Sequence, residues 1–250
     1  MRRFELTMMT RRRFIVTSGT LLIATLLPDE TLAAPIVERV NNTWNEIRIA
    51  RNSGSDITAA FILQSLNLPF SSTEFRLGIF ELVRRAPYQL GSWNGDSMQL
   101  FQQGYGDCRH KAAAVNMLLN LGGVISKKEI VRFDWADLPI PNEILSILPQ
   151  TQSFHDTVIF DLDGKHLLLD ATWDIDLANA GFPIMPYWDG NSSTWPVTIS
   201  NEVTPMILPR SGQDIYTANQ LKWPVKEKTI EFNKEMNIWL SKVRETNLIK

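Results

Sequence analysis

One stretch limits the possible folds more than any other. It runs from Gly104 to Gly123 and contains the only cysteine in the 250-residue chain. Its first letters are GYGDCRHKAAA, and no glycine or proline then interrupts it before the Gly-Gly pair that follows Leu121. Such a run closed by glycines predicts a helix that ends at Leu121. Asp107 is expected to be its N-cap, because aspartate side chains accept the unpaired backbone N–H groups of a first helical turn.

This placement puts Cys108 at or near the first helical position. There the helix dipole and the unpaired amides favour the thiolate form, which is the nucleophilic form of cysteine. Ala112, Val115 and Leu119 form an inward-facing stripe, so we expect the helix to be buried while its N-terminus opens onto a cleft. A single cysteine is nevertheless most often a small buried hydrophobic residue. A chemical role therefore requires partners elsewhere in the chain.

A second stretch offers those partners. Residues 154–161 and 166–172 are predicted to be antiparallel strands joined by a turn at Asp163-Gly164. With this turn, His155 and Asp170 become diagonal neighbours on one face, about 7 Å apart. The carboxylate would then hold one ring nitrogen of the imidazole and leave the other for the thiol. A bulge at Gly164 would shift the register by one residue and turn Asp170 away.

These residues resemble the motifs of the bacterial transglutaminase-like domain family, which is part of the papain-like cysteine enzyme superfamily. GDCRHKA with its Leu-rich helix is similar to the family's cysteine motif, while His155 and the later letters LDAT are similar to its histidine and aspartate motifs. The resemblance covers about residues 88–173, with the same order and spacing. It implies an α+β fold in which a cysteine-bearing helix packs on an antiparallel sheet that carries the histidine and the aspartate. It also implies a catalytic triad of Cys108, His155 and Asp170.

Two departures from the family pattern affect the expected substrate more than the triad. Family members commonly carry an acid where His110 stands. They carry an apolar or aromatic residue soon after the histidine, where this chain has Asp156 and Thr157.

The chemistry expected from the triad is acyl transfer at an amide bond of a peptide or protein. A thioester on the cysteine would be resolved by water in a peptidase or amidase, or by an amine in a transglutaminase. The sequence leaves both open, with hydrolysis favoured over cross-linking. An arylamine acetyltransferase uses a similar triad, but no other feature supports it. The alternative from another class is a non-catalytic envelope-binding protein with the same fold.

The remaining histidines are weaker candidates for the base. His110 points about 200° around the helix from Cys108 and is expected at the surface. His166 lies about 13 Å along its strand from Asp170. No CxxC or HExxH motif is present, and the aspartates near residues 161–176 do not match a calcium loop. The sequence therefore predicts neither a cofactor nor a metal.

The first 33 residues form a separate segment. Five arginines precede a moderately apolar run from Phe14 to Leu27, which predicts a secretory signal cleaved after Ala33 or, less favourably, after Ala34. The letters TRRRFI are typical of twin-arginine export signals. The apolar run has 14 residues, fewer than the roughly 20 of a spanning helix, so no stable membrane anchor is expected. We therefore expect a periplasmic or secreted bacterial protein whose precursor uses the twin-arginine export machinery.

Residues 34–250 are expected to form a single domain. Removing five arginines and three acids from the 25 basic and 27 acidic residues leaves 20 and 24, a net charge of −4. This balance indicates neither nucleic acid nor an anionic membrane as a partner. One cysteine excludes an internal disulfide, so the thiol is free.

The rest of the chain is expected to support the cysteine helix. The apolar spacing predicts helices over 36–51, from Ser55 or Asp56 to Leu66, and from Ser72 or Thr73 to about Arg85. A short helix at 96–103 and a strand at 129–133 should follow. The insertion 135–153, with a short helix at 142–148, should form part of the substrate rim, and Trp93 is a candidate for lining the cleft. Short strands are expected at 197–199 and 206–208. A C-terminal helix should dock through Phe232, Met236, Trp239, Leu240 and Val243.

Overall fold

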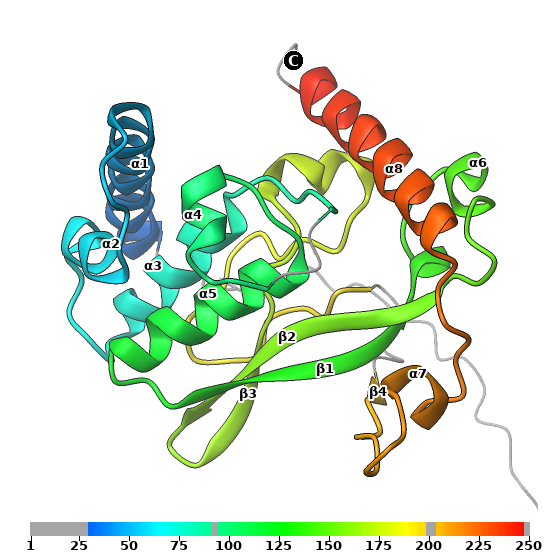
Figure 1. The fold of residues 1–250 in the computed structure, drawn as a ribbon. Coiled ribbons are helices and arrows are strands. Elements are labelled where there is room, and N and C mark those ends of the chain that lie inside the picture. Colours follow the sequence, from blue (N-terminus) through cyan, green and yellow to red (C-terminus); the bar gives the residue numbers. More distant parts are fainter. Residues whose placement is uncertain (1–29, 92–94, 199–203, 248–250) are drawn as a thin grey trace, which may run out of the picture.

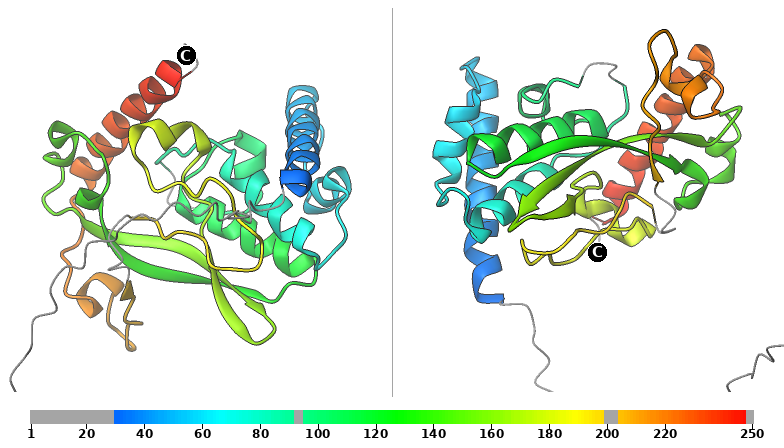
Figure 2. Two further views of the ribbon diagram at one scale, coloured as in Figure 1. Left: turned by 180° about the vertical axis from the view of Figure 1, so that it is seen from behind. Right: turned by 90° about the horizontal axis from the view of Figure 1, so that it is seen from below.

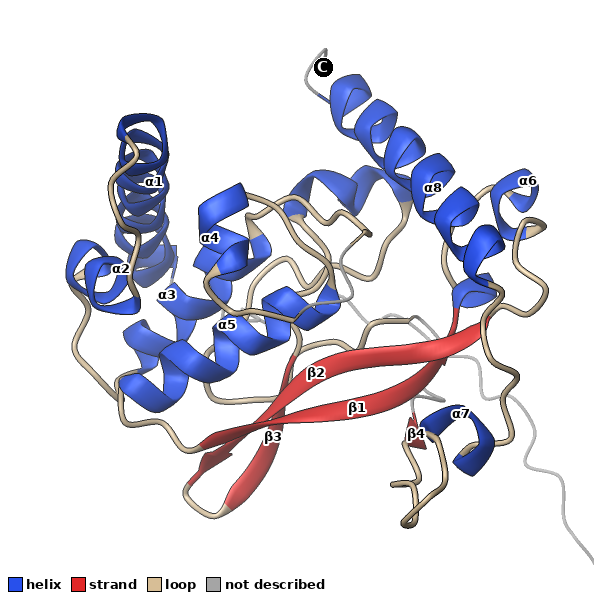
Figure 3. Ribbon diagram, viewed as in Figure 1, coloured by secondary structure: helices blue, strands red, loops and turns tan. Residues whose placement is uncertain are grey.

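The computed structural model of the chain describes residues 30–91, 95–198 and 204–247. Residues 1–29, which carry most of the predicted export signal, and Trp93 lie outside this part. The fold is mixed α+β, as expected (Figure 1, Figure 3). Among the described helices, none is both long enough and apolar enough to cross a bilayer.

A small antiparallel sheet forms the platform of the fold. Its strand order is β3-β2-β1-β4, with β1 at Ser126–Asp134, β2 at Gln152–Leu162, β3 at Lys165–Leu169 and β4 at Thr204–Pro205. The strand predicted at 129–133 is therefore longer at both ends. Helices α1, α2 and α3 lie at one end of the sheet, and the C-terminal helix α8 (Lys226–Asn247) lies at the other (Figure 1, Figure 2).

The hairpin between β2 and β3 has the predicted register. Val158 pairs with Leu169, and the pairing continues without interruption to Leu162 opposite Lys165. Asp163 and Gly164 at the turn have φ angles of 54° and 77°. Two successive residues with positive φ are what a tight hairpin turn requires, and the Asp-Gly pair adopts them easily. No bulge shifts the register. The strand predicted at 166–172 ends earlier, however, because β3 stops at Leu169 and the N–H of Asp170 donates to the hydroxyl of Thr194 instead of to a strand.

The cysteine-bearing helix is α5, Cys108–Leu121, and it has the predicted boundaries. Asp107 is its N-cap, and its side chain accepts hydrogen bonds from the backbone N–H groups of Arg109 and His110. Ala112, Val115 and Leu119 are buried as expected. The helix packs on β1 and β2, so its first residue is held over the sheet.

The helices before α5 form a scaffold: α1 at Glu30–Ser53, α2 at Ala59–Leu66, α3 at Thr73–Arg84 and α4 at Gln99–Gln103. Ser72 caps α3, as predicted. The predicted cap of α2 at Ser55 or Asp56 is wrong. Thr58 fills that place, because its hydroxyl accepts the backbone N–H of Phe61 at 3.1 Å.

Two apolar clusters meet near Cys108. The first joins α1, α2, α3 and α5 to the sheet residues Val158, Phe160 and Leu169. The second lies under α8 and is rich in aromatic side chains: Tyr88, Phe133, Trp135, Trp173, Phe182 and Phe232. Cys108 packs against this second cluster, although the body of its helix belongs to the first.

The C-terminal helix docks through the predicted face. Phe232, Met236 and Leu240 are buried, and Trp239 and Val243 pack beside them.

The region between β3 and α8 differs most from expectation. It contains the 3₁₀ helix η2 (Ile175–Ala180), β4 and the short helix α7 (Ile215–Ala218). The strands predicted at 197–199 and 206–208 are wrong over the described residues. The carbonyl of Val197 accepts the indole N–H of Trp173 at 2.8 Å. The backbone N–H of Ile207 donates to Asn219 Oδ1, and the Nδ2 group of Asn219 donates to the carbonyl of Ile207. Side chains therefore occupy the backbone groups that would otherwise pair with a neighbouring strand.

The insertion between β1 and β2 is also more compact than predicted. It starts with the 3₁₀ helix η1 (Trp135–Asp137), and the helix expected at 142–148 is limited to α6, Asn142–Leu145.

Candidate active site

Cys108 is the first residue of α5 and is partly exposed. The cap leaves its backbone amide unused: Asp107 Oδ1 accepts the N–H of Arg109 at 3.1 Å and that of His110 at 3.5 Å. Within the described residues, nothing accepts the N–H of Cys108. The nucleophile candidate therefore carries a free donor on its own backbone, at the positive end of a 14-residue helix.

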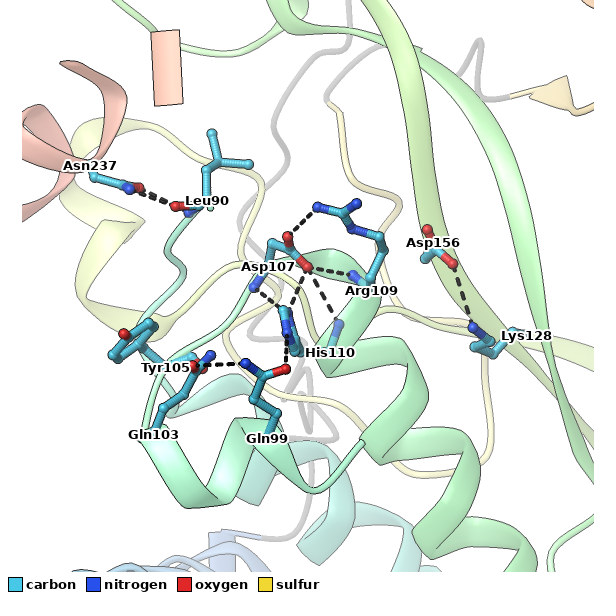
Figure 4. A network of polar contacts seen from close by, with 10 residues as sticks. All are labelled: Leu90, Gln99, Gln103, Tyr105, Asp107, Arg109, His110, Lys128, Asp156 and Asn237. Carbon is cyan, nitrogen blue, oxygen red and sulfur yellow. Dashed lines mark hydrogen bonds and ion pairs between the residues drawn. The ribbon is translucent and has the colours of Figure 1, made fainter. Parts of the chain in front are cut away.

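His110 is not a surface residue, so that prediction is wrong. Its side chain is 1% exposed, and Nδ1 lies 2.8 Å from Asp107 Oδ1 and 3.3 Å from the Asp107 backbone nitrogen (Figure 4). On the other side of the ring, Nε2 lies 3.3 Å from Oε1 of Gln99. The imidazole thus completes a capping box in the place where an acidic or amide side chain usually stands.

Arg109 also holds the N-cap residue Asp107, because its guanidinium donates to Asp107 Oδ2 at 2.6 Å. Burial by itself would raise the pKa of Asp107, but the hydrogen bonds from His110 and Arg109 outweigh it and lower that pKa. Asp107 therefore stays charged and keeps the start of the helix fixed.

His155 and Asp170 form a direct pair. His155 Nε2 lies 2.7 Å from Asp170 Oδ2, with both side chains almost fully buried. The carboxylate is held in turn by the backbone N–H of Thr172, which donates to Oδ1 at 3.0 Å. The Asp170 N–H donates to the hydroxyl of Thr194 at 2.8 Å. Phe133 closes one side of the imidazole, 5.9 Å away between ring centres and at 72° to it.

The electrostatics of this pair favour an imidazolium. Burial by itself would lower the pKa of His155, but the charge of Asp170, the hydrogen bond to it and the adjacent Cys108 raise it to about 10. Burial would likewise raise the pKa of Asp170, but the charge of His155 and the hydrogen bonds it accepts lower it. Cys108 lies close enough to contribute to this rise in the pKa of the same ring. The structure thus brings together all three residues that the sequence singled out.

A cleft of about 320 Å³ opens beside Cys108. Its walls are mostly apolar and include seven aromatic side chains: Tyr88, Phe133, Trp135, Phe154, Tyr216, Trp223 and Phe232. Residues 148–150 of the predicted insertion line one side, as expected for a rim. The other side comes from α7, the segment Lys222–Val225 and α8, and no sequence signal predicted this placement.

Four charged residues line this mostly apolar cleft: Asp107, Arg109, Asp156 and Lys222. Burial raises the pKa of Asp156, although the charge of Lys128, 3.8 Å away, acts in the opposite direction (Figure 4).

Lys111 is a buried cation that sequence reasoning did not single out. It is 1% exposed, and its Nζ donates to the carbonyl of Thr172 at 2.8 Å and to that of Arg84 at 3.4 Å. Burial lowers the pKa of Lys111 to about 7, against the opposite effect of Asp174. Because Thr172 also holds the Asp170 carboxylate, Lys111 links α5 to the loop that carries Asp170. The only sequence signal for the burial of Lys111 is its position on the inner face of the helix, one turn after the cysteine.

His166, the third histidine of the chain, lies apart from the site. The side chain of His166 is 73% exposed, and its Nδ1 is 3.6 Å from Asp161. The described residues contain no group of three or more His, Cys, Asp or Glu arranged to hold a metal ion.

Comparison with family models, with curated proteins and with solved structures finds no match to this chain.

Proposed function

We propose that the protein is a thiol enzyme that transfers acyl groups from amide bonds of peptides or proteins, with a fold of the papain-like and transglutaminase-like type. The observation that carries this proposal is the 2.7 Å pair of His155 and Asp170 beside a cysteine at the start of a buried helix. A buried aspartate that orients a histidine toward a nucleophile is the arrangement by which many hydrolases activate serine or cysteine.

The reaction would run in two steps. The thiolate sulfur of Cys108 bonds to the substrate carbonyl carbon, and the carbonyl π pair moves onto oxygen. When this pair returns, the carbon–nitrogen bond breaks, the imidazolium of His155 gives its proton to the departing amine, and a thioester remains. Water or a second amine then attacks the thioester carbon while His155 takes up the proton of the attacking group. The carbon–sulfur bond breaks, which releases the acyl product and restores the Cys108 thiolate. Asp170 stays charged throughout and orients the ring.

Mass spectrometry with a peptide library tests this function. The wild-type protein should shorten peptides by adding water across an amide bond, or exchange ammonia for an added amine, and Cys108→Ala should do neither. The alternative is a non-catalytic binding protein of the cell envelope. It predicts that wild type leaves every peptide unchanged while Cys108→Ala binds a ligand as tightly as wild type.

An exported location remains part of the proposal, on the sequence of residues 1–33 alone. If the paired arginines address the twin-arginine route, Arg11→Lys together with Arg12→Lys should retain the precursor in the cytoplasm. Normal export of this double variant would favour the general secretory route.

A further inference from the structure

Tyr88 is fixed beside the cysteine loop by its backbone. It forms an isolated parallel β-bridge with Gly106, two positions before Cys108. The N–H of Gly106 donates to the carbonyl of Pro87, and the N–H of Gln89 donates to the carbonyl of Gly106, both at 3.1 Å. Tyr88 and the start of α5 are therefore parts of one hydrogen-bonded unit.

The opposite side of Tyr88 is anchored just as firmly. Its N–H donates to Asp174 Oδ2 at 2.8 Å, and Arg244 of α8 donates to its carbonyl at 2.9 Å and to the same carboxylate at 2.7 Å. The ring packs on Trp173, with 4.6 Å between ring centres. These contacts hold both the backbone and the aromatic ring of Tyr88 in place.

The hydroxyl group is the one part of Tyr88 without a partner. Both hydrogen bonds of Tyr88 to described residues are made by its backbone. The residue is only 2% exposed and lines the cleft together with Cys108. The hydroxyl is not among the fully buried polar atoms without a partner, so it keeps some accessible surface in a residue that lines the cleft. A hydroxyl available there without a protein partner points to a hydrogen-bonding group supplied by the ligand.

The electrostatic surroundings of Tyr88 are consistent with a hydroxyl that donates to a ligand. Burial raises the pKa of Tyr88 well above 10, and the charge of Cys108 is the next largest cause. The phenol lines the same cleft as the nucleophile and keeps its proton at neutral pH. It therefore acts there as a neutral hydrogen-bond donor and not as a base.

We propose that the hydroxyl of Tyr88 and the backbone N–H of Cys108 together form the oxyanion hole of this site. The inference rests on the proposed acyl-transfer function and adds Tyr88 as a further catalytic residue. When the Cys108 sulfur bonds to the carbonyl carbon, the electron pair displaced onto oxygen would be stabilised by these two donors. The pair then returns to carbon as the leaving group departs, and both donors keep their protons.

Two reagents separate this role from a structural one. Iodoacetamide alkylates a thiolate by displacing iodide and forms no oxyanion, whereas p-nitrophenyl acetate acylates it through a tetrahedral oxyanion. Single-turnover rates for both, followed by mass spectrometry of Cys108, give a ratio of acylation to alkylation. Tyr88→Phe keeps the ring on Trp173 and should lower this ratio at least about tenfold, since removing one oxyanion donor costs many enzymes 10²–10³ in rate. Its alkylation rate should stay within about twofold of wild type.

Tyr187→Phe is the matched control, because Tyr187 is 62% exposed; its ratio should equal that of wild type. A Tyr88→Phe ratio equal to that of wild type, with acylation in wild type far faster than in the denatured protein, would overturn the role of Tyr88 and leave the proposed function standing. If the wild-type protein acylates no faster than the denatured chain, both the proposed function and the oxyanion hole fail.

Discussion

At the scale of single residues, the site is organised by charges that are buried and paired. His155 and Asp170 lie 2.7 Å apart in a region where water scarcely screens them. Because the pKa of His155 is raised to about 10, the ring stays protonated through the neutral range. An imidazolium next to a thiol stabilises the thiolate, which is the condition for a reactive cysteine near neutral pH.

Alkylation kinetics test this arrangement directly. Wild-type protein should react with iodoacetamide at pH 6 at least about tenfold faster than denatured protein, since the imidazolium favours the thiolate. His155→Ala should remove most of this advantage, while Asp170→Asn should have a smaller effect by loosening the ring. His166→Ala is the control, because that exposed histidine lies outside the site. A wild-type protein that labels no faster than the denatured chain would show that Cys108 is a structural cysteine.

At the scale of secondary-structure elements, local sequence signals predicted the parts that carry the three candidate residues. The Asp-Gly turn fixed the register of the hairpin, because a tight turn with two positive φ angles allows only one alignment. The N-cap of Asp107 and the glycines after Leu121 bounded α5 correctly. Both signals act within a few residues of chain, and for that reason a single sequence reveals them.

Features that depend on distant residues could not be predicted in this way. His110 was expected at the surface from its angle on the helix, but it is buried by the cap and by Gln99, eleven positions earlier. The second wall of the cleft comes from α7 and the segment before α8, which approach Cys108 only in the folded chain. The strands expected after residue 197 fail because Asn219 takes the hydrogen bonds of Ile207.

The cap of α5 should matter for both stability and reactivity. Asp107→Ala removes the acceptor for two backbone N–H groups and the partner of buried His110, and should lower the free energy of unfolding by about 1–2 kcal/mol or more. Thr58→Ala removes the ordinary cap of α2 and should cost about 1 kcal/mol. Urea denaturation measures both. Only Asp107→Ala should also slow the alkylation of Cys108; equal alkylation rates in the two variants would mean that the cap does not position the thiol.

The segment before α8 should contribute to substrate binding. Trp223 lines the cleft and packs against Tyr216, with 4.5 Å between ring centres and the ring planes tilted by 40°. Trp223→Ala should raise the KM for peptides with large apolar side chains about five- to tenfold, a loss of roughly 1 kcal/mol of apolar contact. Alkylation by the much smaller iodoacetamide should not change. Trp195→Ala serves as the control, since Trp195 is half exposed and lies outside the cleft lining; an equal rise in KM there would argue against a specific role for Trp223.

At the scale of the whole molecule, the fold buries two basic side chains whose pKa values shift in opposite directions. The pKa of Lys111 falls from an ordinary 10.5 to about 7 because of burial, whereas that of His155 rises from 6.5 to about 10. Between pH 7 and 10 the unfolded chain binds a proton at Lys111 that the folded chain lacks, so folding stability gains as pH rises. Over the same window the folded chain keeps a proton at His155 that the unfolded chain lacks, so stability is lost as pH rises. The two effects have similar size and opposite sign, and the wild-type protein should show little net change.

Lys111→Met should reveal the pH dependence of folding stability that His155 contributes. The methionine keeps most of the buried chain volume but removes the titrating group, so only the loss from His155 remains. The free energy of unfolding of this variant should fall steadily from about pH 7 to pH 10, by up to about 1.4 kcal/mol per pH unit. Urea denaturation at several pH values measures the slope, and Lys165→Met, at an exposed lysine in the hairpin, should follow wild type. A Lys111→Met curve parallel to that of wild type would mean that Lys111 is not neutral in the folded protein, because a lysine protonated in both states contributes no slope.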